Sequence, residues 1–262
     1  MRSFTAAAFL IIGTLDVSAG TGIKLTVRDG RPLIEGVYAN GHGPYRFLLD
    51  TGAETNQIHA RLARSIGLEP SYRVQLATAA GVTEVAGGNG ASIQMGSVTS
   101  SDQEFLFTDL ASLREWSPDV QGVLGQAFLA KFDYLLDLHR KRLVLGGGEF
   151  EGARVPMEQF SGRLAVFTSL GHLVLDSGSN RLVLFRNDGR ATKELARTAA
   201  GFLPARVVRK ETLVVEGQTY AIGEAVALPR PAQTPEDGLL AASLFRAIYV
   251  CNSGKYMILN PR

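Results

Sequence analysis

Residues 47–54 read Phe-Leu-Leu-Asp-Thr-Gly-Ala-Glu, an apolar run that ends in a carboxylate and a Thr-Gly pair. Residues 173–179 repeat the pattern as Leu-Val-Leu-Asp-Ser-Gly-Ser. Burying an unpaired carboxylate is costly, so an aspartate directly after an apolar strand needs a specific reason. The two aspartates, Asp50 and Asp176, lie 126 positions apart (176 − 50). We infer that the chain contains two versions of one lobe, each contributing an aspartate to a shared site.

Two further matches follow the aspartates in the same order in both halves. Residues 78–81, Thr-Ala-Ala-Gly, recur letter for letter as residues 198–201, at an offset of 120 (198 − 78). Residues 122–125, Gly-Val-Leu-Gly, have a similar counterpart in Gly-Leu-Leu-Ala at 238–241, at an offset of 116 (238 − 122). Ordered anchors with slowly drifting offsets are typical of a duplicated unit whose loops have shortened.

The boundary between the halves is expected near residues 146–160, where glycine accumulates and the strand pattern lapses. This places an N-terminal lobe at residues 20–148 and a C-terminal lobe at residues 149–262. Most local patterns alternate as strands do. The other local predictions are short helices at 61–67 and 126–131, a helical turn at 192–197 and a flexible joint at 87–90.

Composition favours β structure and argues against nucleic acid as a partner. Of the 262 residues, 45% are apolar, 20% are charged and 29 are glycine, which indicates a globular chain with many turns. The formal net charge is +2, from 27 basic and 25 acidic residues, and no basic cluster stands out. Nucleic-acid binding is therefore not indicated.

The first 19 residues have the pattern of a secretory signal peptide. A basic start at Arg2 precedes an apolar stretch, Ala6 to Leu15, and small residues at Val17-Ser18-Ala19. We expect cleavage before Gly20 and an exported chain, periplasmic or secreted, with no stable membrane span afterwards. A buried N-terminal strand or helix is the alternative. Cys251 is the single cysteine, so no intramolecular disulfide can form.

Two adjacent carboxyls can hydrolyse a peptide bond without a metal or a covalent intermediate. Like charges at hydrogen-bonding distance cannot both ionise comfortably, so one carboxyl keeps a proton and the pair titrates as a unit. The ionised member can take a proton from water, and the protonated member can donate to the substrate carbonyl. The neighbouring side chains are small or carry a hydroxyl: Thr51, Gly52 and Ala53 in the first half, and Ser177, Gly178 and Ser179 in the second.

With these residues the chain resembles the retropepsin-like and pepsin-like aspartic proteases. The first motif, Asp50-Thr51-Gly52-Ala53 with the later Val123-Leu124-Gly125, is similar to retropepsins, and residues 40–53 to their exported bacterial members. Residues 176–179, Asp-Ser-Gly-Ser, resemble the form that the same motif has in pepsin-like proteases. The resemblance covers roughly residues 25–262.

The resemblance implies an all-β fold of two pseudo-symmetric, double-psi-type β-barrel lobes with a cleft between them. It implies catalytic Asp50 and Asp176, with Thr51 and Ser177 cross-bracing their loops and a flap around Ala80, Gly81 and Val82. The implied protein is a monomeric aspartic endopeptidase that acts on a peptide or protein substrate, with no cofactor or metal.

The second motif departs from the family pattern. Ala241 stands where the first half has Gly125, and Asn180-Arg181 is an unusual exit from the motif. Neither flap candidate carries the tyrosine familiar from pepsin-like enzymes. These departures concern the second lobe's competence more than the first's.

Three other interpretations stay open at this point. A degenerate second lobe would leave a silent peptide-binding module, or a homodimer that uses Asp50 from each chain. A serine hydrolase built on Ser177 and His172 lacks the Gly-x-Ser-x-Gly pattern. The four histidines show no metal-ligand spacing such as His-x-x-x-His.

Overall fold

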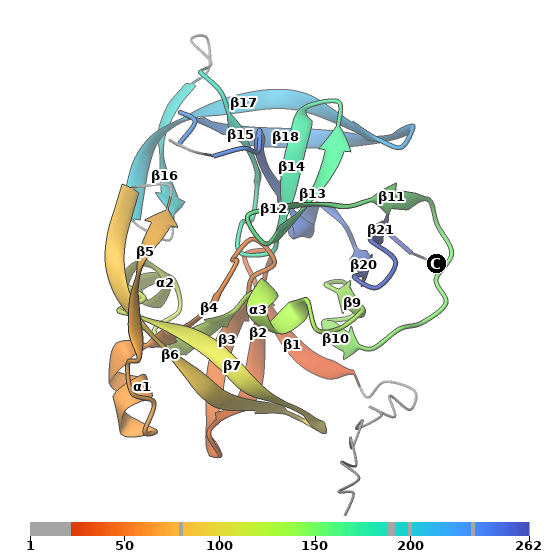
Figure 1. The fold of residues 1–262 in the computed structure, drawn as a ribbon. Helices are drawn as coiled ribbons and strands as arrows, with labels where there is room; N and C mark the ends of the chain where they lie inside the picture. The colour runs from red at the N-terminus through yellow and green to blue at the C-terminus, as the bar shows by residue number, and fades with distance from the viewer. Residues whose placement is uncertain (1–21, 79–80, 188–191, 199–200, 232–233, 262) are drawn as a thin grey trace, which may run out of the picture.

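The structure is a computed structural model that describes residues 22–78, 81–187, 192–198, 201–231 and 234–261. Strands dominate, and in the part of the chain described they form two sheets (Figure 1). None of the helices in these ranges is long and apolar enough to span a bilayer.

The larger sheet contains the strands of the first half and three strands from later in the chain. Its members are β1 (Ile23–Arg28), β2 (Arg31–Ala39), β3 (His42–Leu49), β4 (Asn56–His59), β5 (Tyr72–Thr78), β6 (Gly81–Met95), β7 (Val98–Thr108), β8 (Val120–Leu124), β9 (Tyr134–Asp137), β10 (Arg142–Leu145), β11 (Arg154–Pro156), β20 (Ala247–Cys251) and β21 (Tyr256–Leu259). The last hairpin, β20–β21, pairs with β9, so the sheet links both ends of the chain (Figure 1).

The smaller sheet is formed by the second half alone. Its members are β12 (Glu158–Phe160), β13 (Arg163–Thr168), β14 (Gly171–Asp176), β15 (Leu182–Phe185), β16 (Thr192–Thr198), β17 (Gly201–Val215), β18 (Gln218–Leu228) and β19 (Gly238–Ala241). Short helices fill connections: α1 (Ala60–Ser65), α2 (Ala111–Trp116), α3 (Gln126–Leu129) and the 3₁₀ helix η1 (Ala242–Leu244).

The strand pairings repeat between the halves. β3 runs parallel to β8, and β4 is antiparallel to β8 and parallel to β7. β14, β15, β19 and β18 make the same pairings in the same order. Phe47 faces Gly122 in the first half, and Leu173 faces Gly238 in the second. The ordered sequence anchors therefore occupy equivalent places in the two sheets.

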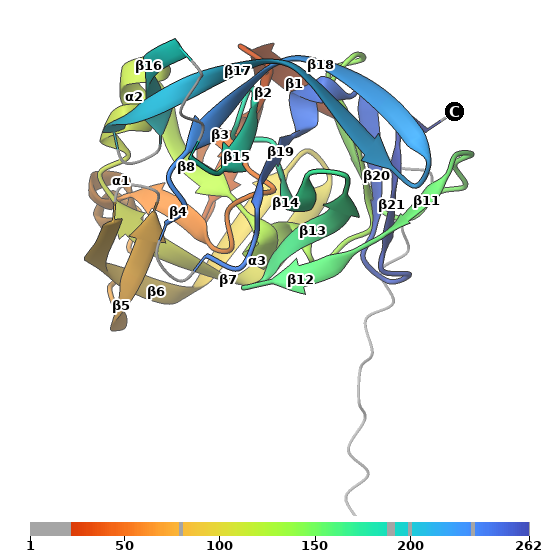
Figure 2. The ribbon, with the colours of Figure 1, turned by 90° about the horizontal axis from the view of Figure 1, so that it is seen from above.

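The first and last residues of the repeated Thr-Ala-Ala-Gly stretches pair in two equivalent hairpins. Thr78 pairs with Gly81 between β5 and β6, and Thr198 pairs with Gly201 between β16 and β17. The two hairpins lie on the same side of the molecule, as both views show (Figures 1 and 2). The flap candidate Ala80 lies outside the described residues. Gly81 is the first residue of β6, and Val82 follows it with 66% of its side chain exposed.

Two local predictions were wrong, both because strand pairing outweighs local propensity. Residues 192–197 lie in β16, an edge strand paired to β17, and not in a helical turn. The glycines at 87–90 lie inside the continuous strand β6, where the pairing to β7 shifts register after Gly88. A Cβ on Gly88 would lie 2.6 Å from the Glu69 carbonyl oxygen, so this glycine allows a close backbone approach.

Other boundaries differ by a few residues. The helix predicted at 61–67 spans Ala60–Ser65, and the one at 126–131 spans Gln126–Leu129. Helix α2 was not predicted. The prediction of an all-β fold with two related halves agrees with the observed strand pairings, whereas the lobe boundary at residue 148 stays a prediction.

Candidate active site

Each aspartate follows a buried strand at an equivalent point of its half. Asp50 comes directly after β3, and Asp176 is the last residue of β14. The preceding residues, 47–49 and 173–175, are buried with at most 4% exposure, which fixes both strand ends in the core. Below, residues 50–54 are called the first loop and residues 176–180 the second loop.

The two loops meet, with each glycine against the opposite carboxyl. A Cβ built on Gly178 would lie 2.5 Å from Asp50 Oδ2, and one on Gly52 would lie 2.7 Å from the Asp176 carboxyl carbon. Real side chains do not tolerate such distances, so both positions require glycine. The absence of a side chain in each loop lets the opposite carboxyl approach.

Thr51 and Ser177 interlock the loops through four buried hydrogen bonds. The Thr51 hydroxyl donates to the Leu175 carbonyl (2.9 Å) and accepts from the Ser177 N–H (3.0 Å). In return the Ser177 hydroxyl donates to the Leu49 carbonyl (2.6 Å) and accepts from the Thr51 N–H (3.0 Å). Both side chains are fully buried. The arrangement is symmetric, so neither loop can move without breaking bonds of the other.

Backbone donors orient both carboxyls. The Gly52 N–H donates to Asp50 Oδ1 at 2.9 Å, and the Ser179 N–H donates to Asp176 Oδ1 at 2.9 Å. Ala53 is tied to α3 through its carbonyl, which accepts from the Gln126 N–H at 2.8 Å. Four of the six predicted loop residues, Thr51, Gly52, Ser177 and Gly178, thus contact the opposite loop. Ser179 supports Asp176 within its own loop, and Ala53 is tied to α3.

Burial raises the pKa of both carboxyls, but the two groups affect each other in opposite directions. For Asp50, the N–H of Gly52 and a hydrogen bond from Asp176 work against burial and lower the pKa. For Asp176, the negative charge of Asp50 adds to burial and raises the pKa further. The two carboxyls therefore titrate as a coupled pair, in which the partner's hydrogen bond lowers the pKa of Asp50 and the partner's charge raises that of Asp176.

Known proteins resemble this chain in the sequence of its first half and in its fold. The model of the family described as aspartyl protease matches residues 36–128. The basic 7S globulin from soybean is 10% identical in sequence, and its match covers 90% of this chain and 93% of that one with a TM-score of 0.54. Residues 36–128 are thus similar to the aspartyl protease family, and the chain shares the fold of the soybean globulin. The resemblance noted in the sequence and the acid-protease fold are thereby confirmed.

A retropepsin-like aspartic protease from Rickettsia conorii also matches this chain, at 20% identity and a TM-score of 0.36. That match covers 48% of this chain and 89% of the Rickettsia chain. No curated protein sequence matches the chain.

The aspartic protease fold also brings in residues that the sequence did not single out. Arg31, at the start of β2, donates through Nε to the Gly178 carbonyl of the second loop at 2.6 Å. Its guanidinium lies 5.1 Å from the centre of the Trp116 ring, whose Nε1 donates to Asp29 at 2.8 Å. Trp116 is partly exposed, and its ring supports this arginine.

Beneath the first loop lies a buried set of amide side chains. Asn56 Oδ1 accepts from the Gly125 N–H (3.0 Å), and its Nδ2 donates to Gln103 Oε1 (3.2 Å). Gln126 Nε2 donates to the Thr51 carbonyl at 2.8 Å. These amide side chains contact residues that are distant in the sequence, and such contacts leave no periodic pattern or motif. The sequence alone therefore could not indicate that these amides support the loop.

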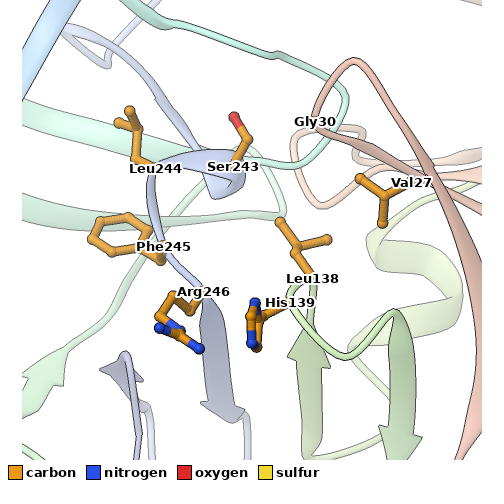
Figure 3. A pocket seen from close by; sticks show the side chains of 8 residues that line it. All are labelled: Val27, Gly30, Leu138, His139, Ser243, Leu244, Phe245 and Arg246. Carbon is orange, nitrogen blue, oxygen red and sulfur yellow. The ribbon is translucent and has the colours of Figure 1, made fainter.

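The hollow shown in Figure 3 is separate from the aspartates. It is lined by Val27, Gly30, Leu138, His139, Ser243, Leu244, Phe245 and Arg246. None of these residues belongs to either loop, although the Ser243 hydroxyl donates to the Asn180 carbonyl at 3.3 Å. Within the described ranges, no three metal-ligating side chains gather as a cation site.

Proposed function

We propose that this chain is an aspartic endopeptidase in which Asp50 and Asp176 share one catalytic water. The observation that carries the proposal is the placement of Gly52 against the Asp176 carboxyl and Gly178 against Asp50. This placement supports a single-chain dyad because both carboxyls come from one chain and no second copy is needed to complete the pair. The family and fold support protease activity in general.

In the proposed reaction, ionised Asp50 accepts a proton from the water as the water oxygen attacks the substrate carbonyl carbon. Asp176 gives its proton to the carbonyl oxygen, which yields a neutral gem-diol. Asp50 then delivers its proton to the amide nitrogen while a diol hydroxyl returns one to Asp176. The carbon–nitrogen bond breaks, and both carboxyls regain their starting states.

The surrounding residues supply fixed geometry for this chemistry. Thr51 and Ser177 hold the loops at one separation, which preorganises the pair before substrate binds. We propose that a peptide lies between the dyad and the hairpins β5–β6 and β16–β17, with residues 80–82 as part of a flap. We also propose export through residues 1–19 and action as a monomer of two lobes, 20–148 and 149–262.

Peptide-library cleavage across acidic to neutral pH tests the proposal. We expect cleavage by the parent protein and at least about 1,000-fold slower cleavage by both Asp50→Asn and Asp176→Asn, since each loses one proton-transfer group. Asp102→Asn is the matched control because Asp102 is exposed, with a φ of +52° that asparagine also adopts.

The other outcomes separate the competing functions. Full activity in Asp176→Asn would overturn the single-chain dyad and favour paired Asp50 residues from two chains. Peptide binding without cleavage by the parent at any pH would instead show a silent binding module.

A further inference from the structure

Gln126 makes a buried contact with the first loop that has no counterpart in the second. It is the first residue of α3 and is 2% exposed. Its Nε2 donates to the Thr51 carbonyl oxygen at 2.8 Å, across 75 positions of sequence. A buried amide at this position therefore acts on the loop that carries Asp50.

The acceptor carbonyl belongs to the peptide group that also serves Asp50. The Thr51 carbonyl and the Gly52 N–H form one planar peptide group. The Gly52 N–H donates to Asp50 Oδ1 at 2.9 Å. Gln126, the peptide group and the carboxyl thus form a continuous series of hydrogen bonds, in which each bond polarises the next.

Gln126 is itself held in place from two sides. Its N–H donates to the Ala53 carbonyl at 2.8 Å, and the preceding N–H, of Gly125, donates to Asn56 Oδ1 at 3.0 Å. A Cβ on Gly125 would lie 2.6 Å from the Ala53 carbonyl oxygen, so the backbone packs tightly there. The side-chain amide is preoriented toward Thr51.

The second loop lacks this series. Leu124 pairs through β8 with the strand of the first loop, and Leu240 does so through β19 for the second. Two positions further on, Gln126 corresponds to Ala242, whose methyl group cannot donate. Asp176 Oδ1 takes its hydrogen bond from Ser179 instead.

We propose that Gln126 is a positioning residue that fixes the Thr51–Gly52 peptide group, so that the Gly52 N–H stabilises Asp50 as the ionised member of the pair. This inference rests on the proposed function for its catalytic meaning. A donor to the carbonyl of a peptide group strengthens the donor at its nitrogen, which favours the charged carboxylate.

The electrostatic surroundings of Asp50 are consistent with this assignment. Among its hydrogen-bond partners, the Gly52 N–H lowers the pKa of Asp50 the most. Asp176 is the ionisable side chain among the causes of its pKa shift, and Arg31 donates through Nε to the Gly178 carbonyl. The asymmetry between the aspartates therefore arises from the loop surroundings and their mutual interaction.

The test compares the full chain with its Gln126→Met variant, which keeps a similar volume but removes the donor. Carboxyl carbon NMR titrations of labelled aspartate, assigned with Asp50→Asn and Asp176→Asn, measure the pair directly. We expect the lower of the two titrations to move up by about one pH unit, the scale of one lost stabilising interaction. Gln94→Met is the matched control, since Gln94 is exposed on β6.

An unchanged lower titration would overturn the positioning role, whether or not the protein cleaves peptides. If Gln126→Met does not fold, Gln126→Asn is measured in the same way, since its shorter amide also withdraws the donor from Thr51. If the parent shows no cleavage but the titration moves, the positioning role stands and the proposed function fails. With cleavage present, the acid limb of kcat/KM should move with the titration while KM stays within about two-fold.

Discussion

The two loops have the same interlocked geometry, but the buried side chains packed beneath them differ. We call these side chains the floor of each loop. Beneath the first loop lie the amides of Asn56 and Gln126, which bond to backbone groups of the loop and of Gly125. Beneath the second loop the equivalent positions hold Leu182 and Ala242, both fully buried. The side chains beneath the loop are therefore polar in one half and apolar in the other. A duplicated frame can thus give its two carboxyls different environments.

This difference bears on how the carboxyls divide their roles. Identical surroundings would leave the choice of proton holder to the substrate alone. Here a polar floor supports the backbone donor to Asp50, whereas burial and the charge of Asp50 raise the pKa of Asp176. The asymmetry of the surroundings exists before any peptide binds, so under the proposed function the acid and base roles would be set in the free protein.

The largest expected effect comes from forcing the two loops apart. Gly178→Ala would place a methyl against Asp50, and Gly52→Ala would place one against Asp176. We expect each to lower kcat/KM at least about 100-fold, since displacing reacting groups by about 1 Å has this effect. We also expect a loss of about 1–3 kcal/mol in unfolding free energy from overpacking.

Cleavage assays and thermal unfolding check this prediction. Gly223→Ala is the control, because a Cβ there has no neighbour within 4 Å. Near-normal activity in both loop variants would mean that the carboxyls need not be so close, and would contradict the shared-water arrangement. A large loss in only one would show that one loop is more rigid than the other.

The loops themselves could be predicted from sequence because their signals are local. An apolar strand, an aspartate and a Thr-Gly or Ser-Gly pair stand together within eight residues, and the same order of anchors occurs twice. Those features also indicated the fold class. The pairing of Phe47 with Gly122 and of Leu173 with Gly238 shows why the glycine anchors recur, since both face large residues across parallel strands.

The supporting residues could not be predicted because their contacts cross the fold. Gln126 meets a partner 75 positions away, and Arg31 meets one 147 positions away. Neither side chain lies in a periodic or motif-like pattern. The strand at 192–198 was missed for a related reason, since an edge strand depends on the partner to which it pairs.

Exchanging the floors is expected to have an intermediate effect. Asn56→Leu copies the second half's apolar floor, but it leaves the Gly125 N–H and the Gln103 amide without their partner. We expect a loss of about 2–3 kcal/mol in unfolding free energy, as is usual for unsatisfied buried groups. The reciprocal Leu182→Asn buries an unpaired amide and should cost about as much.

Chemical denaturation of the two variants and of their combination measures this effect. Since the floors lie in different halves, we expect the two losses to add in the double variant. A near-neutral result for Asn56→Leu would show that apolar packing supports either loop equally well. The difference between the two floors would then make no contribution to the unfolding free energy.

The smallest effect concerns how stability depends on pH. Burial, together with the charge of Asp50, raises the pKa of Asp176 above its ordinary value of 3.8. Between that value and the raised one, the folded chain holds a proton that the unfolded chain has released. Folded-state stability from this group is therefore fully present below pH 3.8 and is lost as pH rises toward the folded pKa.

Asp176→Asn removes the titrating group, so its melting temperature should fall less than the parent's as pH rises above 4. We expect the difference in unfolding free energy between the two proteins to change by about 1.4 kcal/mol for each unit of pKa shift. Asp102→Asn should keep the parent's profile because its carboxyl is exposed. Parallel profiles for the parent and Asp176→Asn would mean that Asp176 titrates as an ordinary surface carboxyl. In that case the asymmetric environment of the pair, and the acid role that follows from it, would have to be abandoned.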